Sequence, residues 1–217
     1  VQWILNPYDE WYALVRALEL KEANGGTVTV INVGGAANDA TIRKALAIGA
    51  DDAIRIDASG DLDSYAIASE IAAVAKSGAY DVVLLGKETI NYNGSNLGGM
   101  LAELIDLPFV SYASKLDMAG NTATIEREIE GGKEVLSVDT PFVISCAKGM
   151  AEARIPNMKG IMSAKTKPLA VVAPQGAASL TSVVKYELPP AKGACKMISA
   201  DQPEELIRLL HEEAKMI

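Results

Sequence analysis

Short apolar runs alternate with helix-like segments along this sequence, and that alternation limits the chain to a small set of folds. Apolar runs at residues 28–33, 53–56, 82–85 and 142–147 have the length of strands, and helical spacing of apolar residues follows Asn6-Pro7 and recurs at 38–48 and 63–77. Strands that are apolar along their whole length are typical of parallel sheets covered on both faces by helices. The sequence therefore predicts an α/β fold with a mostly parallel sheet flanked by helices.

The pattern changes after Pro108. Segments 109–115, 122–129 and 134–138 have strand character, and Gly131-Gly132 suits a hairpin turn, so we predict an antiparallel edge to the sheet. Residues 173–200 contain five Pro or Gly residues and little apolar periodicity, and a short amphipathic helix is expected at 203–215. We accordingly expect an α/β domain over 1–172 and an extended C-terminal arm over 173–217.

Composition excludes several classes of protein. The 217 residues include 28 acidic and 20 basic side chains, and this net charge of −8 argues against general binding to nucleic acids or membrane surfaces. No apolar run reaches the roughly 18 residues of a transmembrane helix, so direct membrane insertion is not expected. Cys146 and Cys195 form no metal-type or redox-type pair, and His211 lies in a polar segment without catalytic partners. We predict no metal site and no catalytic residues.

A glycine-rich and amide-rich segment, 86–99, leads from an apolar strand into a predicted helix at 100–105. Ligands of parallel sheets bind at the carboxyl ends of the strands, which here are Val33-Gly34 and Leu85-Gly86. A helix N-terminus at that edge favours a phosphate group. The spacing alone favours a plain strand-to-helix connection over a phosphate site, and residues 6–9 fit a helix cap about as well as a contact to a ribose or base.

Residues 148–168 carry five cations and one acid, a net charge of +4 in an acidic chain. Apolar Ile155, Met158, Ile161 and Met162 are interleaved with these cations, which is unusual for a merely solvated loop. A solvated basic loop is the plain interpretation of this segment, and the interleaved apolar residues are the observation that speaks against it.

Five motifs, in order, resemble the electron transfer flavoprotein beta subunit family. They are Asn6-Pro7 with the acidic helix that follows, residues 41–51 (TIRKALAIGAD), 84–87 (LLGK), 126–132 (EREIEGG), and the segment 151–168. The resemblance covers essentially the whole chain. It implies an adenine nucleotide-binding, Rossmann-like fold and a heterodimer whose alpha subunit holds most of an FAD.

In this family the beta subunit carries a structural AMP. The resemblance places the AMP site at Asn6, Pro7, Tyr8 and Asp9, at Val33, and along the loop formed by Gly86, Lys87, Glu88, Thr89, Ile90, Asn91, Tyr92, Asn93, Gly94, Ser95, Asn96 and Leu97. This loop differs from that of many members, which have acidic residues and a Thr-Gly or Gln pair there. The family also has a first strand and loop, with flavin contacts, before the point that matches Val1.

The resemblance further implies electron transfer from dehydrogenases, notably acyl-CoA dehydrogenases, to a membrane quinone oxidoreductase. Glu128 aligns with an acidic residue that pairs with the mobile flavin domain of the alpha subunit, and Ile155 aligns with the apolar anchor that enters a pocket on the dehydrogenase. The expected docking residues are Glu128, Arg154, Ile155, Pro156, Met158, Lys159, Ile161, Met162 and Lys165. The chain would be an electron-carrier subunit, not an enzyme, in the cytoplasm of a bacterium or the mitochondrial matrix of a eukaryote.

Two alternatives remain open at this point. One is a nucleotide-using enzyme of the adenine nucleotide alpha-hydrolase-like fold, although its S-G-G-x-D-S loop is absent from these residues. The other is a bifurcating flavoprotein that holds a second FAD in place of AMP.

Overall fold

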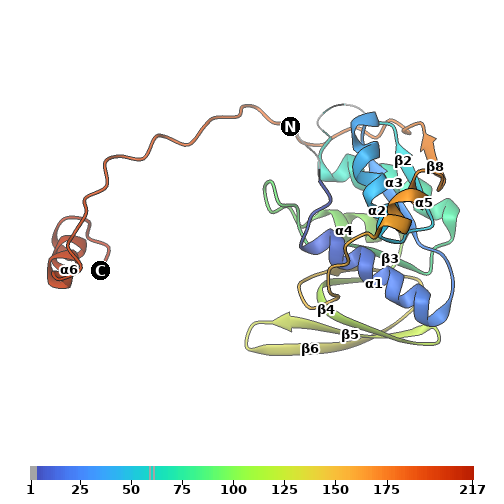
Figure 1. The fold of residues 1–217 in the computed structure, drawn as a ribbon, viewed down its shortest axis with the longest axis horizontal. Coiled ribbons are helices and arrows are strands. Elements are labelled where there is room, and N and C mark those ends of the chain that lie inside the picture. Colours follow the sequence, from blue (N-terminus) through green and yellow to red (C-terminus); the bar gives the residue numbers. More distant parts are fainter. Residues whose placement is uncertain (1–3, 59, 61) are drawn as a thin grey trace. The chain divides into compact units, whose positions relative to one another are not determined.

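A computed structural model describes residues 4–58, 60 and 62–217 (Figure 1). Within them the chain forms two compact units, which divide between Ser182 and Val183. The helices are α1 (Asp9–Asn24), the short 3-10 helix Ala36–Asn38, α2 (Asp39–Ile48), α3 (Ser64–Gly78), α4 (Leu97–Ile105), α5 (Met158–Ala164) and α6 (Pro203–Glu212). The strands are β1 (Thr29–Val33), β2 (Asp52–Ile56), β3 (Val82–Gly86), β4 (Phe109–Ala119), β5 (Thr122–Ile129), β6 (Gly132–Asp139), β7 (Phe142–Cys146) and β8 (Leu169–Val172).

The strands of the described residues form two sheets. The first is fully parallel with order β1-β2-β8, and the second has order β3-β7-β4-β5-β6, parallel from β3 to β4 and antiparallel from β4 to β6. The expected α/β fold with parallel strands and an antiparallel edge is confirmed. The strands do not form one continuous sheet, however, because β1 and β3 are not hydrogen-bonded to each other in the described part of the chain.

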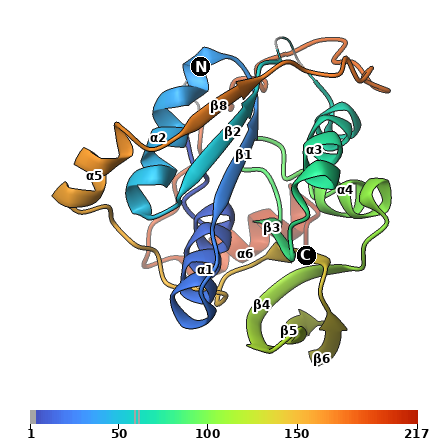
Figure 2. The same ribbon diagram turned by 90° about the vertical axis from the view of Figure 1, so that its right-hand side faces the viewer.

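Helices cover both faces of these strands. In Figure 2, α1 and α2 lie on one side of β1, and α3 and α4 lie on the other. One core cluster joins Leu14 and Leu18 of α1 to α2 and β2, and another joins α3 and α4 to the partly buried Ile31 and Val83. A third core cluster fills the space between α1 and the strands β4, β5 and β7, where Phe142 and Cys146 are fully buried.

Helix α1 begins later than the sequence indicates. The expected start was an Asn6 cap followed by Pro7, but the first helical residue is Asp9. The Asn6 side-chain oxygen instead accepts a hydrogen bond from the Tyr8 amide at 3.0 Å, which makes a local turn in front of the helix. Asn6 therefore organises the entry into α1 without being its cap.

Two carboxylates of the α3 segment fix residues 175–181. The buried carboxylate of Glu70 accepts hydrogen bonds from the amides of Gln175 (2.7 Å), Gly176 (2.8 Å) and Ala177 (2.8 Å). The carboxylate of Asp63, the N-cap of α3, also accepts hydrogen bonds from the amides of Leu180 and Thr181. The beginning of the predicted arm is thus attached to the first unit, whereas residues 183–199 of the second unit have no helix or strand before α6.

None of the helices in the described part of the chain is long and apolar enough to cross a bilayer.

We predict that protonation of Glu70 releases residues 175–177. Burial opposes ionisation of this carboxyl, but the three amides hold its pKa below the ordinary value. The stabilisation is therefore complete above the unfolded-state pKa of about 4.3 and is lost as the pH falls through the lower folded-state pKa. Amide hydrogen exchange at 175–177 should accelerate on acidification, and Glu70→Gln should show fast exchange already at pH 7.

The matched control is Glu130→Gln, an exposed carboxylate in the turn between β5 and β6. It should leave exchange at 175–177 unchanged. Equal protection in Glu70→Gln and the parent protein would contradict the assignment.

Candidate functional site

The start of α1 packs directly on the carboxyl end of β3. A Cβ at Gly86 would lie 3.0 Å from Cβ of Asp9 and 3.0 Å from the backbone nitrogen of Glu10. These distances are shorter than most real Cβ contacts, so a side chain at this position would push the start of the helix away from the strand, and glycine permits the close approach. The two segments that the sequence assigns to one site, 6–9 and 86–97, are therefore adjacent.

Asn6 joins these two segments through hydrogen bonds. Its side chain is buried, and its amide nitrogen donates to the backbone oxygen of Glu88 at 3.2 Å. Its own backbone N–H donates to a carboxylate oxygen of Glu10 at 2.9 Å. Asn6 thus acts as a structural bridge between α1 and the loop after β3.

The loop after β3 closes on itself. The Thr89 amide donates to the Gly94 oxygen at 3.0 Å, and the Gly94 amide donates to the Thr89 hydroxyl oxygen at 3.0 Å. Asn93 has a left-handed backbone with φ of 53°, which asparagine tolerates better than most residues. The tip of the loop exposes Ile90 and Tyr92.

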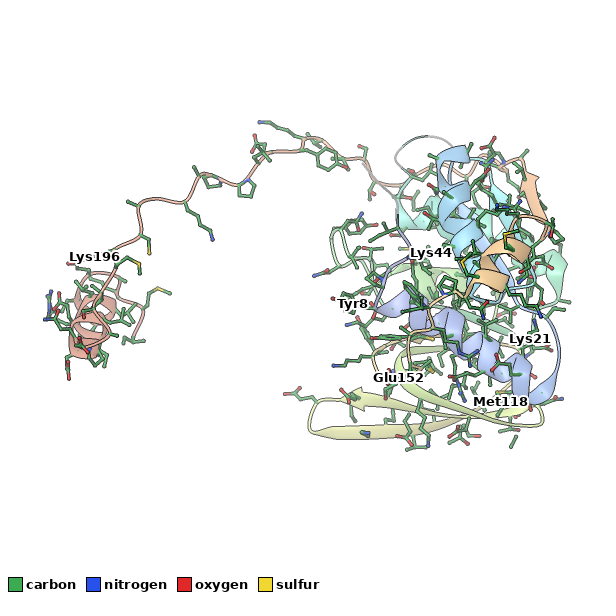
Figure 3. The ribbon with its side chains drawn as sticks, viewed as in Figure 1. Tyr8, Lys21, Lys44, Met118, Glu152 and Lys196 are labelled. Carbon is green, nitrogen blue, oxygen red and sulfur yellow. The ribbon has the colours of Figure 1, made fainter. Side chains whose placement is uncertain are left out.

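A cavity of about 210 Å³ lies between this loop and the start of α1. Its lining comprises Tyr8, Asp9, Lys87, Glu88, Thr89, Ile90, Asn93 and Lys148. Tyr8 is 64% exposed and is labelled in Figure 3. The volume lies below the roughly 300–1,000 Å³ of pockets that enclose a whole small ligand.

Opposite charges meet at this cavity. Lys87 forms an ion pair with Glu88, with 2.9 Å between Nζ and Oε1, and this contact raises the pKa of Lys87. Burial raises the pKa of Asp9, while the neighbouring Lys87 acts in the opposite direction. The site therefore offers cations for an anion together with carboxyl oxygens that can accept hydrogen bonds from hydroxyl groups.

Other residues of the expected nucleotide site lie outside this lining. Val33 and Leu97 pack with α3 and α4 in a core cluster, and Gly98 is required there because a Cβ would approach the Phe109 ring to 2.9 Å. Asn96 precedes α4 without capping it through its side chain, so that side chain does not cover the first-turn amides. The remaining predicted residues outside the lining are Asn6, Pro7, Gly86, Asn91, Tyr92, Gly94, Ser95 and Asn96.

Sequence reasoning did not assign Lys148 or Tyr112 to this place. Lys148 follows β7, and its position beside Lys87 depends on the pairing of β7 with β3, which no local pattern reveals. Tyr112 lies in an irregular part of β4 with a φ of 55°, and Nζ of Lys87 is 6.0 Å from its ring centroid.

The segment expected as a docking loop contains a helix. Residues 158–164 form α5, and Asn157 caps it by accepting a hydrogen bond from the Gly160 amide at 2.8 Å. The loop interpretation of 148–168 is therefore wrong for these residues. The helix is only seven residues long and contains a glycine, so its periodicity is weak.

Helix α5 and the residues just before it present apolar side chains to solvent. Ile155 is 88% exposed, Met158 74%, Met162 60% and Ile161 42%, and Ala164 is buried against α2 and its neighbours. Exposed groups of this size are unusual for surfaces that contact only water. The family resemblance predicts that these side chains dock a dehydrogenase, and we call Ile155, Met158, Ile161 and Met162 the apolar docking surface for that reason.

Reciprocal contacts hold α5 against α2. Arg43 of α2 donates to the backbone oxygens of Ala164 (2.8 Å) and Lys167 (2.5 Å) at the end of α5. In return, Nζ of Lys167 donates to the oxygens of Leu46 (2.9 Å) and Ala50 (2.5 Å) at the end of α2. Cations at both helix C-termini satisfy carbonyl groups that lack helical partners.

A groove of about 380 Å³ is lined by the end of α2 and by residues 154–160.

The expected docking residue Glu128 lies elsewhere. It is exposed on β5, in register with Lys133 of β6. No group of three or more His, Cys, Asp or Glu side chains within the described ranges could hold a metal ion.

The sequence matches one family of known proteins along almost its whole length. A family model described as "Electron transfer flavoprotein domain" matches residues 1–176. The electron transfer flavoprotein subunit beta of Bacillus subtilis is 36% identical, covering 100% of this chain and 89% of the relative, and that of Syntrophomonas wolfei is 37% identical, covering 99% and 85%. The Caffeyl-CoA reductase-Etf complex subunit CarD of Acetobacterium woodii is 31% identical, covering 98% and 86%.

We predict that Gly160→Ala destabilises the protein. A Cβ at this position would lie 2.3 Å from the backbone oxygen of Ala47, so α5 would have to move away from α2. Overpacking of this kind costs about 1–3 kcal/mol of unfolding free energy, which exceeds the gain of about 1 kcal/mol in helix propensity. Chemical denaturation of the purified protein measures the difference.

Gly99→Ala is the matched control, since Gly99 is also helical and its nearest neighbour would be 3.7 Å away. It should be neutral or stabilising. A Gly160→Ala variant as stable as Gly99→Ala would show that α5 is not closely packed on α2.

Proposed function

The chain belongs to the family of electron transfer flavoprotein beta subunits, and from this membership we propose that it carries electrons as one half of a heterodimer whose alpha subunit holds the FAD. The strongest support is the match along the whole chain with beta subunits at 36–37% identity. When bound, the FAD supplies the redox chemistry, and this chain supplies a rigid support and docking surfaces. The electron donors we propose are acyl-CoA or related dehydrogenases, and the acceptor is a membrane quinone oxidoreductase.

We further propose that the cavity beside Lys87 takes part of an AMP. The residues there suit a nucleoside monophosphate, because Lys87 and Lys148 can neutralise phosphate and Asp9 can accept hydrogen bonds from ribose hydroxyls. The cavity is smaller than a whole nucleotide requires, so we assign it to the phosphate and ribose.

A second candidate for this place is FAD. The CarD relative is named as a subunit of a complex with a caffeyl-CoA reductase, which favours a relationship to bifurcating flavoproteins. In that case the nucleotide site of this chain would hold a second flavin.

The arm and Glu128 are proposed contacts with the alpha subunit. The second unit exposes Val184, Leu188 and Met197 to more than 80%, a degree of apolar exposure that suits burial against another chain. Glu128 is proposed to pair with a cation of the mobile flavin domain. The compartment we propose is the cytoplasm, or the mitochondrial matrix in a eukaryote.

Nucleotide extraction tests the cofactor assignment. Protein co-expressed with its alpha subunit is denatured, and the released nucleotides are separated by chromatography. We expect about one AMP and one FAD per heterodimer. Two FAD and no AMP would support the bifurcating candidate, and a single FAD without AMP would contradict a nucleotide site in this chain.

The docking role of Ile155 is tested by its truncation. Complete burial of an isoleucine contributes about 1.5–3 kcal/mol, or about ten- to a hundredfold in affinity. Exposed cations such as Lys159 contribute about 1 kcal/mol or less each and act mainly on the association rate. Ile155→Ala should therefore raise the apparent KM of an acyl-CoA dehydrogenase for the carrier severalfold or more, without changing nucleotide content or flavin spectrum.

Val135→Ala is a suitable control, because Val135 is 63% exposed on β6, away from the apolar docking surface. It should leave the KM unchanged. Loss of AMP or FAD in Ile155→Ala would mean that Ile155 supports the fold, and an unchanged KM with every candidate dehydrogenase would reject the anchor role.

A further inference from the structure

The main chain on both sides of Ile155 is restrained. On its C-terminal side, Pro156 fixes its own φ and restricts Ile155 to extended conformations, and Asn157 is engaged as the cap of α5. On its N-terminal side, both the side chain and the main chain of Arg154 contact α1. The most exposed apolar residue of the segment is thus held at both ends.

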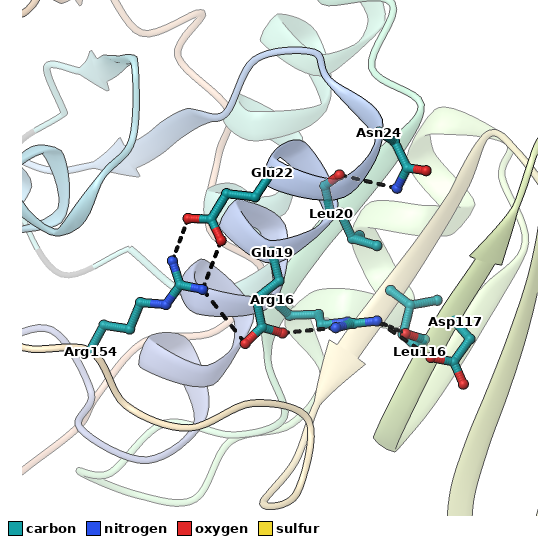
Figure 4. A network of polar contacts seen from close by, with 8 residues as sticks. All are labelled: Arg16, Glu19, Leu20, Glu22, Asn24, Leu116, Asp117 and Arg154. Carbon is teal, nitrogen blue, oxygen red and sulfur yellow. Dashed lines mark hydrogen bonds and ion pairs between the residues drawn. The ribbon is translucent and has the colours of Figure 1, made fainter.

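The side chain of Arg154 forms a two-pronged ion pair with Glu22 (Figure 4). The two guanidinium nitrogens lie 2.5 Å and 2.9 Å from the two carboxylate oxygens. This parallel geometry orients the guanidinium as well as neutralising it. A guanidinium paired in this way offers less charge to an approaching partner than a free one.

The main chain of Arg154 is held by Trp11. The indole nitrogen of Trp11 donates to the Arg154 oxygen at 3.1 Å. The Trp11 ring is itself covered by Lys44 of α2, whose Nζ is 4.5 Å from the ring centroid. Trp11 therefore has a defined position between α2 and the docking segment.

The ion pairs continue across α1 to the antiparallel strands. Glu19 lies 3.8 Å from Arg154 and 2.8 Å from Arg16, and Arg16 in turn contacts the backbone oxygen of Leu116 and the carboxylate of Asp117 on β4 (Figure 4). Isolated surface ion pairs contribute little, but several charges in a connected network with one bidentate pair hold a more definite geometry.

We propose that Trp11 and Glu22 are positioning residues that hold Arg154 and thereby present Ile155 in its binding conformation to the electron-donating dehydrogenase. This inference rests on the proposed function of the apolar docking surface. Ordering a mobile side chain at an interface opposes binding, and a segment that is already ordered avoids most of this cost. Arg154 then contributes to docking mainly through its attachment to α1.

Three variants separate the contacts. Trp11→Phe keeps an aromatic ring next to Lys44 but removes the N–H donor, and Glu22→Gln keeps the shape of the side chain but removes its charge. Arg154→Gln removes the other half of the pair. Glu103→Gln, on the exposed face of α4, is the matched control for loss of a helical carboxylate.

Each variant is measured as the heterodimer with its flavin-bearing subunit, with an acyl-CoA dehydrogenase as electron donor. We expect Trp11→Phe and Glu22→Gln to accelerate amide hydrogen exchange at Gly160 and Ile161, whose amides donate hydrogen bonds to the side chain and the main chain of Asn157. The apparent KM for the carrier should rise about two- to tenfold while kcat stays constant, because only the ordering of the segment changes. Glu103→Gln should change neither quantity.

A double-mutant cycle identifies the mode of action of Arg154. If Glu22 acts only by holding Arg154, the combined Glu22→Gln and Arg154→Gln variant should have the KM of the worse single variant. The exchanged pair, Glu22→Arg with Arg154→Glu, should recover much of the parent KM. The proposal is overturned if the KM effects of the two single variants multiply in the combined variant, or if the exchanged pair does not recover the parent KM. Either result would indicate that Arg154 contacts the dehydrogenase directly.

Failure of this inference is distinguishable from failure of the proposed function. If Ile155→Ala raises the KM but Trp11→Phe and Glu22→Gln change neither exchange nor KM, the positioning role is rejected and the docking role remains. If Ile155→Ala leaves the KM unchanged, the docking role is rejected, and with it the role of Trp11 and Glu22 in presenting Ile155.

Discussion

The close contact between α1 and Gly86 is the constraint on which both candidate surfaces depend. Because the strand ends in a residue without a side chain, the backbone of α1 approaches to within van der Waals contact of β3. This fixes the N-terminal turn of α1 beside the cavity, where Tyr8 and Asp9 form part of the lining. The same helix carries Trp11 and Glu22 to the docking segment. A displacement of α1 would therefore affect both places.

The buried side of α1 explains why one helix can serve two surfaces. Ala13 belongs to the core cluster of β4, β5 and β7, and Leu14 and Leu18 belong to the cluster of α2 and β2. The helix is thus packed against strands of both sheets, and its polar residues are directed by that packing. Ion pairs at its surface refine the positions of neighbouring loops, whereas apolar burial keeps the helix in place.

Local patterns in the sequence were sufficient to predict the bounds of elements whose apolar residues follow one clear period. β5 has the expected bounds of Thr122–Ile129, and β1, β2, β3 and β7 are predicted to within about a residue. The short helix α5 and strand β8 escaped prediction because seven and four residues are too few for a period to emerge. The contacts that secure α5 join residues more than a hundred positions apart, and such pairs leave no local signal.

The candidate site likewise has features that local sequence patterns indicate and features that only the folded structure shows. Strand ends and a glycine-rich loop indicated the edge of the sheet at which to look, and the family resemblance supplied the individual residues. The pairing of β3 with β7, which brings Lys148 to Lys87, and the left-handed backbone of Tyr112 required the three-dimensional structure. The division of the strands into two sheets was likewise beyond local patterns, since hydrogen bonding between strands is a property of the assembled fold.

Cys146, at the end of β7, has a consequence for the chemical durability of the protein. Burial raises the pKa of its thiol to about 12, so the reactive thiolate is almost absent at neutral pH. Proteins that handle electrons in the presence of dioxygen are exposed to peroxide, which oxidises thiolates much faster than thiols. The core of this chain is consequently resistant to sulfenic acid formation, whereas Cys195 is exposed on the chain by itself, and its reactivity depends on whether the arm is covered by the alpha subunit.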